Sequence, residues 1–164
     1  MVGPDGYPEQ KASWLIEERE LHQRSLYFFR LAGKLVSLSR DDYELASLAF
    51  FQATIGLEKS LRLHFASEDG PFAYLFQEAI TKKLVTDVVF SEVRPFEDGL
   101  LRLLKNREVV TTTHCEALAV LIPELRNQFM HGTYLLSPEY LYLTFHLREI
   151  ADVLKTRERA NAFN

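Results

Sequence analysis

The chain has 164 residues, of which 47% are hydrophobic and 26% charged, with 19 basic against 23 acidic side chains. This size and composition are typical of one globular domain, and we expect a single domain over residues 1–164 with fraying at 1–7 and 157–164. The formal net charge of −4 argues against broad DNA binding, which needs a basic surplus to neutralise many phosphates. A local site for one or two phosphates remains compatible with this charge.

The sequence also limits where the protein can be located and which cysteine chemistry it can have. No apolar run reaches the roughly 18 residues that a membrane span needs, and the N-terminal stretch MVGPDGYPEQ has no secretory-signal pattern. Cys115 is the single cysteine, which excludes an internal disulfide and a thiolate cluster for zinc. We therefore expect a cytoplasmic protein that does not enter a membrane.

Large apolar residues recur at helical spacing along the first segment, and they form its predicted inward face: Trp14, Leu21, Phe28, Leu31, Leu35 and Leu38. They predict one continuous helix from about Pro8 or Ser13 to about Leu38. Within it, the four large residues LYFF at 26–29 cover every side of the helix. One side must therefore meet something beyond the core, and a second subunit is the natural candidate.

A second helix is predicted to begin at the cap-forming cluster Ser39-Arg40-Asp41-Asp42 and to run to about Phe65. Its expected inward residues are Leu45, Leu48, Ile55 and Leu63. Gly56 weakens the helix but allows a close neighbour. Glu58 and Arg62 are spaced as an i,i+4 pair, which we expect to be exposed; the alternative is that Glu58 holds Arg126.

The next elements follow the break at 67–71. A third helical region is expected from about Phe72 toward Phe90, with Pro95 interrupting it and a short additional helix from 96 to about 105. A capping box at Thr113 to Glu116 then opens a late helix, whose inward residues are Leu118, Leu121, Leu125 and Phe129.

This late helix should kink or restart at Pro123 and end at Gly132. A last helix should begin at Ser137-Pro138-Glu139 and end near Lys155. No stretch alternates at period two over a useful length. The sequence therefore predicts an all-α fold, an antiparallel bundle of four or more helices with one short additional helix.

The stretch LRNQFMHG, residues 125–132, carries the candidate chemistry. Asn127 and His131 are four residues apart and so lie on nearly the same side of a helix, within reach of the long side chain of Arg126. A permanently charged guanidinium can bind phosphate, an imidazole can exchange a proton near neutral pH, and an amide can orient either group. Metal-free RNA cleavage needs this combination. The alternative is that Arg126 and His131 simply satisfy carbonyls at the helix end.

The stretch RNQFMHG resembles the signature of the HEPN superfamily, an arginine, a polar residue and then a histidine near the end of a late helix. The stretch GLEKSLRLHF at 56–65 resembles the Glu-Lys-rich second helix of that family. This resemblance implies a homodimer with the two motifs facing each other across one cleft. It implies a metal-independent endoribonuclease without a cofactor, in toxin–antitoxin, defence or RNA-processing systems.

By the same resemblance, Arg126 would stabilise the phosphate, His131 would be the acid–base and Asn127 would hold the geometry, leaving 2′,3′-cyclic phosphate and 5′-hydroxyl ends. One branch has a nucleotidyltransferase antitoxin that modifies a tyrosine two residues after the histidine. Here that position is Thr133 and Tyr134 follows it, which departs from the pattern. The alternative function is a non-catalytic module that binds nucleotide, RNA or protein.

The other reactive side chains carry weaker signals. The remaining histidines lack ligand spacing, so we expect no metal site: His22, His64, His114 and His146. Cys115 is interpreted as a small buried side chain, with a lowered pKa at the helix start as the alternative. Scattered cations could form a modest basic rim for RNA or be solvated helix faces: Lys82, Lys83, Arg102, Lys105 and Arg107.

Overall fold

The computed structural model describes residues 22–42, 44–67, 69–91, 113–133 and 139–162. Within these ranges every regular element is a helix: α2 Gln23–Leu38, α3 Glu44–His64, α4 Phe72–Thr81, the 3-10 turn η1 Asp87–Val89, α6 His114–Met130 and α7 Glu139–Ala162. The all-α prediction is thus confirmed. No helix in this part of the chain is long and apolar enough to cross a membrane.

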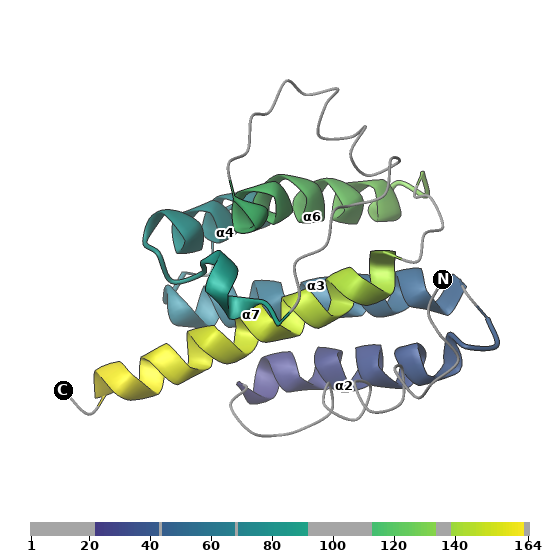
Figure 1. The fold of residues 1–164 in the computed structure, drawn as a ribbon, viewed down its shortest axis with the longest axis horizontal. Coiled ribbons are helices and arrows are strands. Elements are labelled where there is room, and N and C mark those ends of the chain that lie inside the picture. Colours follow the sequence, from purple (N-terminus) through teal and green to yellow (C-terminus); the bar gives the residue numbers. More distant parts are fainter. Residues whose placement is uncertain (1–21, 43, 68, 92–112, 134–138, 163–164) are drawn as a thin grey trace.

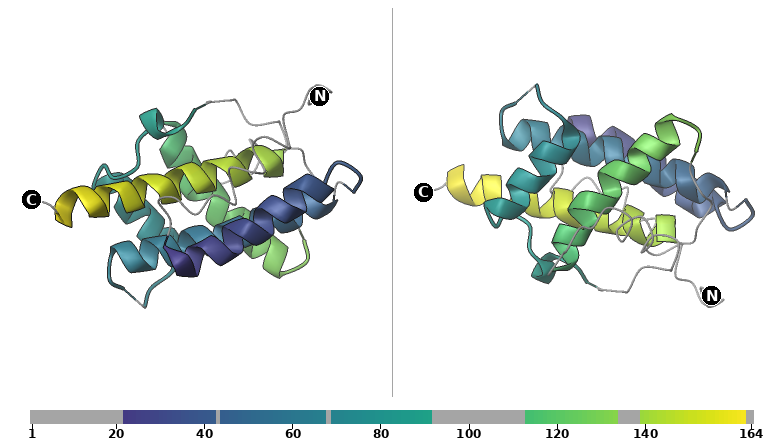
Figure 2. Two further views of the ribbon diagram at one scale, coloured as in Figure 1. Left: turned by 90° about the horizontal axis from the view of Figure 1, so that it is seen from below. Right: turned by 90° about the horizontal axis from the view of Figure 1, so that it is seen from above.

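The helices pack around α3, which touches α2, α4, α6 and α7. In Figure 1, α2 lies on one side of α3 and α7, whereas α4 and α6 lie on the other. Figure 2 shows α6 crossing α3 and α7 at a wide angle, while α2 runs antiparallel to α3 along much of its length. The C-terminal half of α6, which carries the candidate motif, thereby comes to lie on the side of α3 away from α2.

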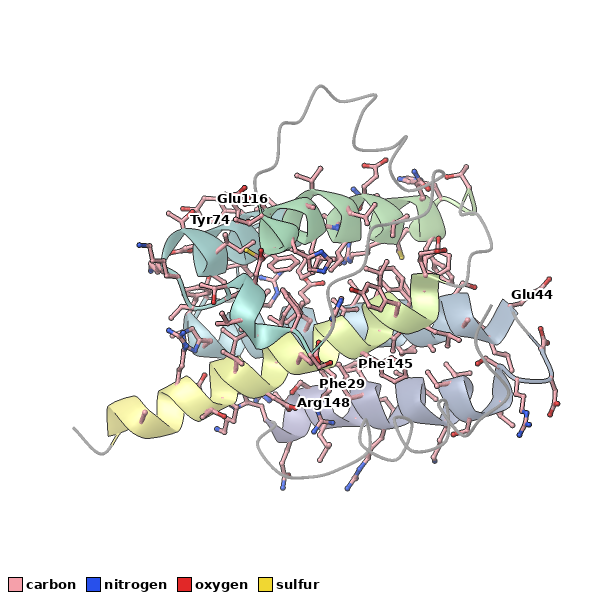
Figure 3. All side chains as sticks on the ribbon, in the orientation of Figure 1. Phe29, Glu44, Tyr74, Glu116, Phe145 and Arg148 are labelled. Atoms are coloured by element: carbon pink, nitrogen blue, oxygen red, sulfur yellow. The ribbon has the colours of Figure 1, made fainter. Side chains whose placement is uncertain are left out.

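The contact between α2 and α3 is close because α3 turns small residues toward α2. A side chain on Gly56 would meet the ring of Phe29, whose Cε2 atom lies 2.8 Å from the position of the missing Cβ. The expectation that Gly56 admits a close neighbour is confirmed. The ring of Phe29 is fully buried, and the guanidinium of the buried Arg148 lies 5.7 Å from the ring centroid (Figure 3).

The first helix is not continuous as predicted, because it is interrupted at His22. His22 is extended (φ −65°, ψ 136°), and α2 begins only at Gln23. The carbonyl of His22 accepts hydrogen bonds from the Ser25 hydroxyl (2.8 Å) and from the backbone N–H of Leu26 (2.9 Å). A helix cannot continue through this extended residue. The part of the prediction over residues 1–21 lies outside the described ranges.

The predicted inward faces of the first two helices are also displaced. In α2 the buried apolar residues are Leu26, Phe29, Ala32 and Val36, and in α3 they are Ala46, Ala49, Phe50, Ala53, Leu57 and Leu61. Leu38 is 57% exposed and Leu48 37% exposed, so both were wrongly placed in the core. The physical reason is that close helix packing favours alanine and glycine at the contact, which leaves some of the larger residues on the flanks.

The cap between α2 and α3 differs from the prediction. Ser39 is the C-cap of α2 and its hydroxyl donates to the carbonyl of Val36 (2.7 Å). The backbone N–H of Glu44 donates instead to the carboxylate of Asp42 (3.1 Å). The predicted cluster thus serves two helix ends, and Asp42 rather than Ser39 serves α3.

The third helix is shorter than predicted. It ends at Thr81 because Lys83 adopts a left-handed conformation (φ 56°). The Lys83 N–H donates to the carbonyl of Ile80 and the Leu84 N–H to that of Ala79. Glycine is the usual residue at this position of the motif, so no stop signal was visible in the sequence. The predicted short helix at 96–105 lies outside the described residues.

The late helix follows the prediction. The hydroxyl of Thr113 accepts from the Glu116 N–H and the Glu116 carboxylate accepts from the Thr113 N–H, so the capping box is confirmed. The expected inward leucines, Leu118, Leu121 and Leu125, are buried. The helix passes through Pro123 without a restart. Gly132 (φ 69°) ends it, with the Thr133 N–H bonded to the carbonyl of Gln128 (2.9 Å).

The last helix is longer than predicted. It continues past Lys155 to Ala162, so the predicted end near Lys155 is wrong. The carboxylate of Glu158 contacts His22 (2.9 Å) and His64 (3.3 Å), which join this end of α7 to α2 and α3. These tertiary contacts stabilise a polar stretch whose sequence alone is typical of a frayed end. The predicted cap at Ser137 and Pro138 lies outside the described residues.

Candidate functional site

The packing of α6 on α3 determines where the motif residues point. Leu125 is buried in the core, and the ring of Phe129 stacks on that of Phe51 with centroids 4.5 Å apart. These two contacts, one turn apart, set the rotation of α6 about its axis. Arg126 follows Leu125 directly and therefore lies on the flank of the contact with α3.

Arg126 is held by Glu58 of α3. Its Nη2 atom lies 3.2 Å from Glu58 Oε2, and the side chains are 30% and 15% exposed. The other oxygen of the same carboxylate, Oε1, accepts from Arg62 Nη2 at 2.7 Å and from Arg62 Nε at 3.2 Å. The exposed pair expected from the sequence is thus a half-buried one, and the alternative in which Glu58 holds Arg126 occurs as well.

The guanidinium of Arg126 is only partly satisfied by this contact. Its Nε atom is buried and has no hydrogen-bond partner within the described part of the chain. A buried donor without an acceptor costs about 1–3 kcal/mol.

Asn127 and His131 lie exposed near the end of α6. His131 is the C-cap residue (φ −92°, ψ 1°), and its backbone N–H donates to the Asn127 carbonyl. The structure places both residues on the accessible end of the helix, whereas Arg126 reaches toward α3. No hydrogen bond among the described residues joins the three side chains to one another. Thr133 is exposed, and Tyr134 lies outside the described ranges.

Glu58 also lines a basic hollow, together with residues from the start of α2 and the end of α3. The hollow has a volume of about 800 Å³, and its polar wall is formed by Arg24, Glu58, Lys59, Arg62 and Ser67. Sequence reasoning did not single out Arg24, because no local pattern relates the first turn of α2 to the last turns of α3. Lys59 belongs to the stretch at 56–65 that resembles the second HEPN helix, and this was the available signal.

The histidines that look scattered in sequence are gathered into two pairs. His22 and His64 share the carboxylate of Glu158, and Lys155 Nζ lies 3.5 Å from the same group. His114 and His146 lie with their ring centroids 5.2 Å apart. Within the described residues, no three histidine, cysteine or carboxylate side chains are grouped as a metal site would require.

The second pair is largely enclosed, and the pKa values of His114 and of the neighbouring Glu149 are both lowered. Burial, together with the neighbouring His146, lowers the pKa of His114. Burial alone would raise the pKa of Glu149, but hydrogen bonds from His146 (2.7 Å) and from the Ser91 N–H (3.0 Å) lower it overall. These contacts join α7 to α6 and to the segment after η1, so this cluster stabilises the packing of these elements.

Cys115 is a buried side chain, as expected. Its Sγ atom lies 3.3 Å from the hydroxyl of Thr113, and burial raises the pKa of its thiol. The alternative of a lowered pKa is therefore wrong. Of the predicted basic rim, Lys82 forms an ion pair with Glu78 (2.7 Å), whereas residues 102, 105 and 107 lie outside the described ranges.

The chain matches no protein-family model, no curated protein and no solved structure. The resemblance to HEPN proteins therefore rests on the two short stretches at 56–65 and 126–132. Function has to be argued from the chemistry of the site.

Proposed function

We propose that this protein is a HEPN-like, metal-independent endoribonuclease that uses Arg126, Asn127 and His131. The observation that carries the proposal is the state of Arg126. Its guanidinium is 30% exposed, is held by Glu58 and keeps a buried Nε donor unsatisfied. Arg126 lies five residues before the exposed His131, and in this proposal one substrate contacts both the cation and the proton-transfer group.

The chemistry assigned to these groups is balanced without a metal or cofactor. His131 takes the proton of a ribose 2′-hydroxyl, and the 2′-oxygen attacks the adjacent phosphorus. Arg126 stabilises the negative charge of the phosphorane. The bond from phosphorus to the 5′-oxygen breaks, and this oxygen leaves with a proton donated by an imidazolium. The products are a 2′,3′-cyclic phosphate and a 5′-hydroxyl.

The proposal includes a homodimer, in which the second copy of His131 would supply that imidazolium. Apolar exposure beside the motif supports pairing there, since Met130 next to His131 is 60% exposed; Tyr27 on α2 is a second exposed apolar residue, at 64%. Of the four large residues at 26–29, Leu26 and Phe29 are buried and Phe28 is half-buried. Sedimentation that shows a monomer at all concentrations would contradict this part of the proposal.

The test is RNA cleavage by the purified protein in excess EDTA, with the product ends identified. We expect cyclic phosphates from the wild type and a loss of about a hundredfold or more in rate for His131→Ala. Arg126→Ala should lose comparable activity. The control is Arg157→Ala, which removes a charge from an exposed position of α7 and should leave the rate unchanged. No cleavage of several RNAs by the wild-type dimer would overturn the proposal.

One observation favours a second candidate, a non-catalytic module that binds RNA or nucleotide. The charge of Arg126 is already balanced by Glu58 at 3.2 Å, so an incoming phosphate has to compete with a carboxylate. A protein that binds RNA through Arg126 but leaves it intact, with and without EDTA, would support this candidate.

A further inference from the structure

The basic hollow is formed by residues that are distant in sequence. Arg24 comes from the first turn of α2, Lys59 and Arg62 come from the last turns of α3, and Ser67 follows α3. The antiparallel packing of α2 on α3 brings the start of one helix beside the end of the other (Figure 1). The volume of about 800 Å³ is within the range of small-ligand sites in proteins.

The hollow concentrates positive charge in an acidic protein. Together with Arg126 it brings four cationic side chains around the single carboxylate of Glu58, although the whole chain has a net charge of −4. Arg24 and Lys59 take part in no ion pair with the residues that the structure describes. Like charges gathered in a concave surface repel one another, and an anionic ligand would relieve this repulsion.

The wall of the hollow is partly preorganised. Arg62 is 21% exposed and donates to Glu58 and, at 3.0 Å, to the carbonyl of Gly70. These contacts hold its guanidinium in place before any ligand arrives, which reduces the entropic cost of binding. Arg24 and Lys59 remain exposed on either side, where they can adjust to phosphate groups.

The hollow is continuous with the candidate cleavage site through one side chain. Arg62 contacts Oε1 of Glu58 and Arg126 contacts Oε2 of the same carboxylate. Glu58 thus joins Arg62, which lines the hollow, to Arg126 of the α6 motif. A strand with a phosphate at Arg126 can therefore place a neighbouring phosphate in the hollow.

We propose that this hollow binds the phosphates of the RNA segment that flanks the cleaved bond, with Arg24 and Lys59 as its ligand-binding cations. This inference rests on the proposed function, because it takes the scissile phosphate to lie at Arg126. The inference also gives the path of the RNA strand, which runs from the end of α6 past Glu58 to the hollow between α2 and α3. The substrate is single-stranded, since duplex recognition would need a far broader basic surface.

The experiment measures binding of a fluorescent single-stranded RNA to the His131→Ala protein by anisotropy over a range of salt concentrations. Arg24→Ala/Lys59→Ala is compared with Lys34→Ala/Arg157→Ala, which removes two exposed cations elsewhere. Both double variants change the net charge equally. We expect the first to weaken binding by about tenfold or more and to reduce the slope of log K against log salt by about 1.4, at about 0.7 per phosphate contact.

Equal affinities and slopes for the two double variants would overturn the inference. The inference would also be overturned if Arg24→Ala/Lys59→Ala weakened the binding of adenosine monophosphate but left the affinity for RNA unchanged. The hollow would then be a site for a free nucleotide. Cleavage with cyclic-phosphate ends is measured separately on the protein with His131 intact. If cleavage persists while RNA binding is indifferent to Arg24 and Lys59, this inference fails and the proposed function stands. If the hollow binds RNA but no cleavage occurs, the proposed function fails instead.

Discussion

Replacement of Glu58 by glutamine should lower the free energy of unfolding by about 1–3 kcal/mol. The carboxylate contacts Arg62 at 2.7 Å and Arg126 at 3.2 Å, and its own side chain is only 15% exposed. Hydrogen bonds to charged groups contribute about 1.5–3 kcal/mol each when shielded. Because the two arginines are 21% and 30% exposed, solvent screening reduces the sum. Glutamine keeps one acceptor but turns an N–H₂ group toward a guanidinium donor.

The assay is urea unfolding followed by circular dichroism, with Glu78→Gln as the matched control. Glu78 pairs with Lys82 at a similar distance, 2.7 Å, but these side chains are 27% and 54% exposed. An i,i+4 pair so open to solvent contributes less than about 0.5 kcal/mol. The Glu58 variant should also bind single-stranded RNA more tightly, because a carboxylate that competes with phosphate has been removed.

A loss of stability for Glu58→Gln no larger than that for Glu78→Gln would refute this reasoning. It would mean that the two arginines are solvated well enough to do without the carboxylate. A double-mutant cycle with Arg126→Leu provides an internal check, since residues in one ion-pair network should show a coupling of about 0.5 kcal/mol or more.

Two further predictions concern packing and pH. Gly56→Ala should lower the free energy of unfolding in urea by about 1 kcal/mol. A Cβ 2.8 Å from the fully buried Phe29 ring overpacks the core, and this costs more than the helix propensity of alanine contributes. Phe29→Leu in the same chain should recover the loss, and no recovery would contradict the steric cause. Burial, with His146 beside it, lowers the pKa of His114 from 6.5. The pKa of Glu149 lies below 4.5 despite burial because His146 and a backbone N–H donate to it. At low pH the unfolded chain therefore binds more protons than the folded chain. The free energy of unfolding should fall as the pH drops below 6.5 and fall further below 4.5. A free energy of unfolding that stays constant between pH 8 and about 4 would contradict this.

Features that depend on a few neighbouring residues were predictable from the sequence. The capping box of Thr113 and Glu116 and the left-handed Gly132 are both closed by hydrogen bonds within six residues, so their signals are local. The inward leucines of α6 follow from helical periodicity. The adjacency of Arg126, Asn127 and His131 likewise needs no more than helix geometry.

Other features were decided by tertiary structure. The faces of α2 and α3 could not be assigned by the largest apolar residues, because Phe29 packs on Gly56 and alanines make up much of the buried face of α3. The end of α4 at Lys83 lacks the usual glycine. The extension of α7 beyond Lys155 is stabilised by contacts of Glu158 with histidines of the α2 and α3 ends.

The candidate site also combines features that the sequence determines with features that depend on tertiary structure. The sequence by itself determined that Arg126 and His131 share one helix end, since their separation along the helix specifies their relative direction. Only the tertiary structure decided that Glu58 contacts both Arg126 and Arg62, and that Arg24 and Lys59 line the same hollow. The physical reason is that these contacts join α2, α3 and α6, and the packing of small residues between helices determines which charged side chains meet.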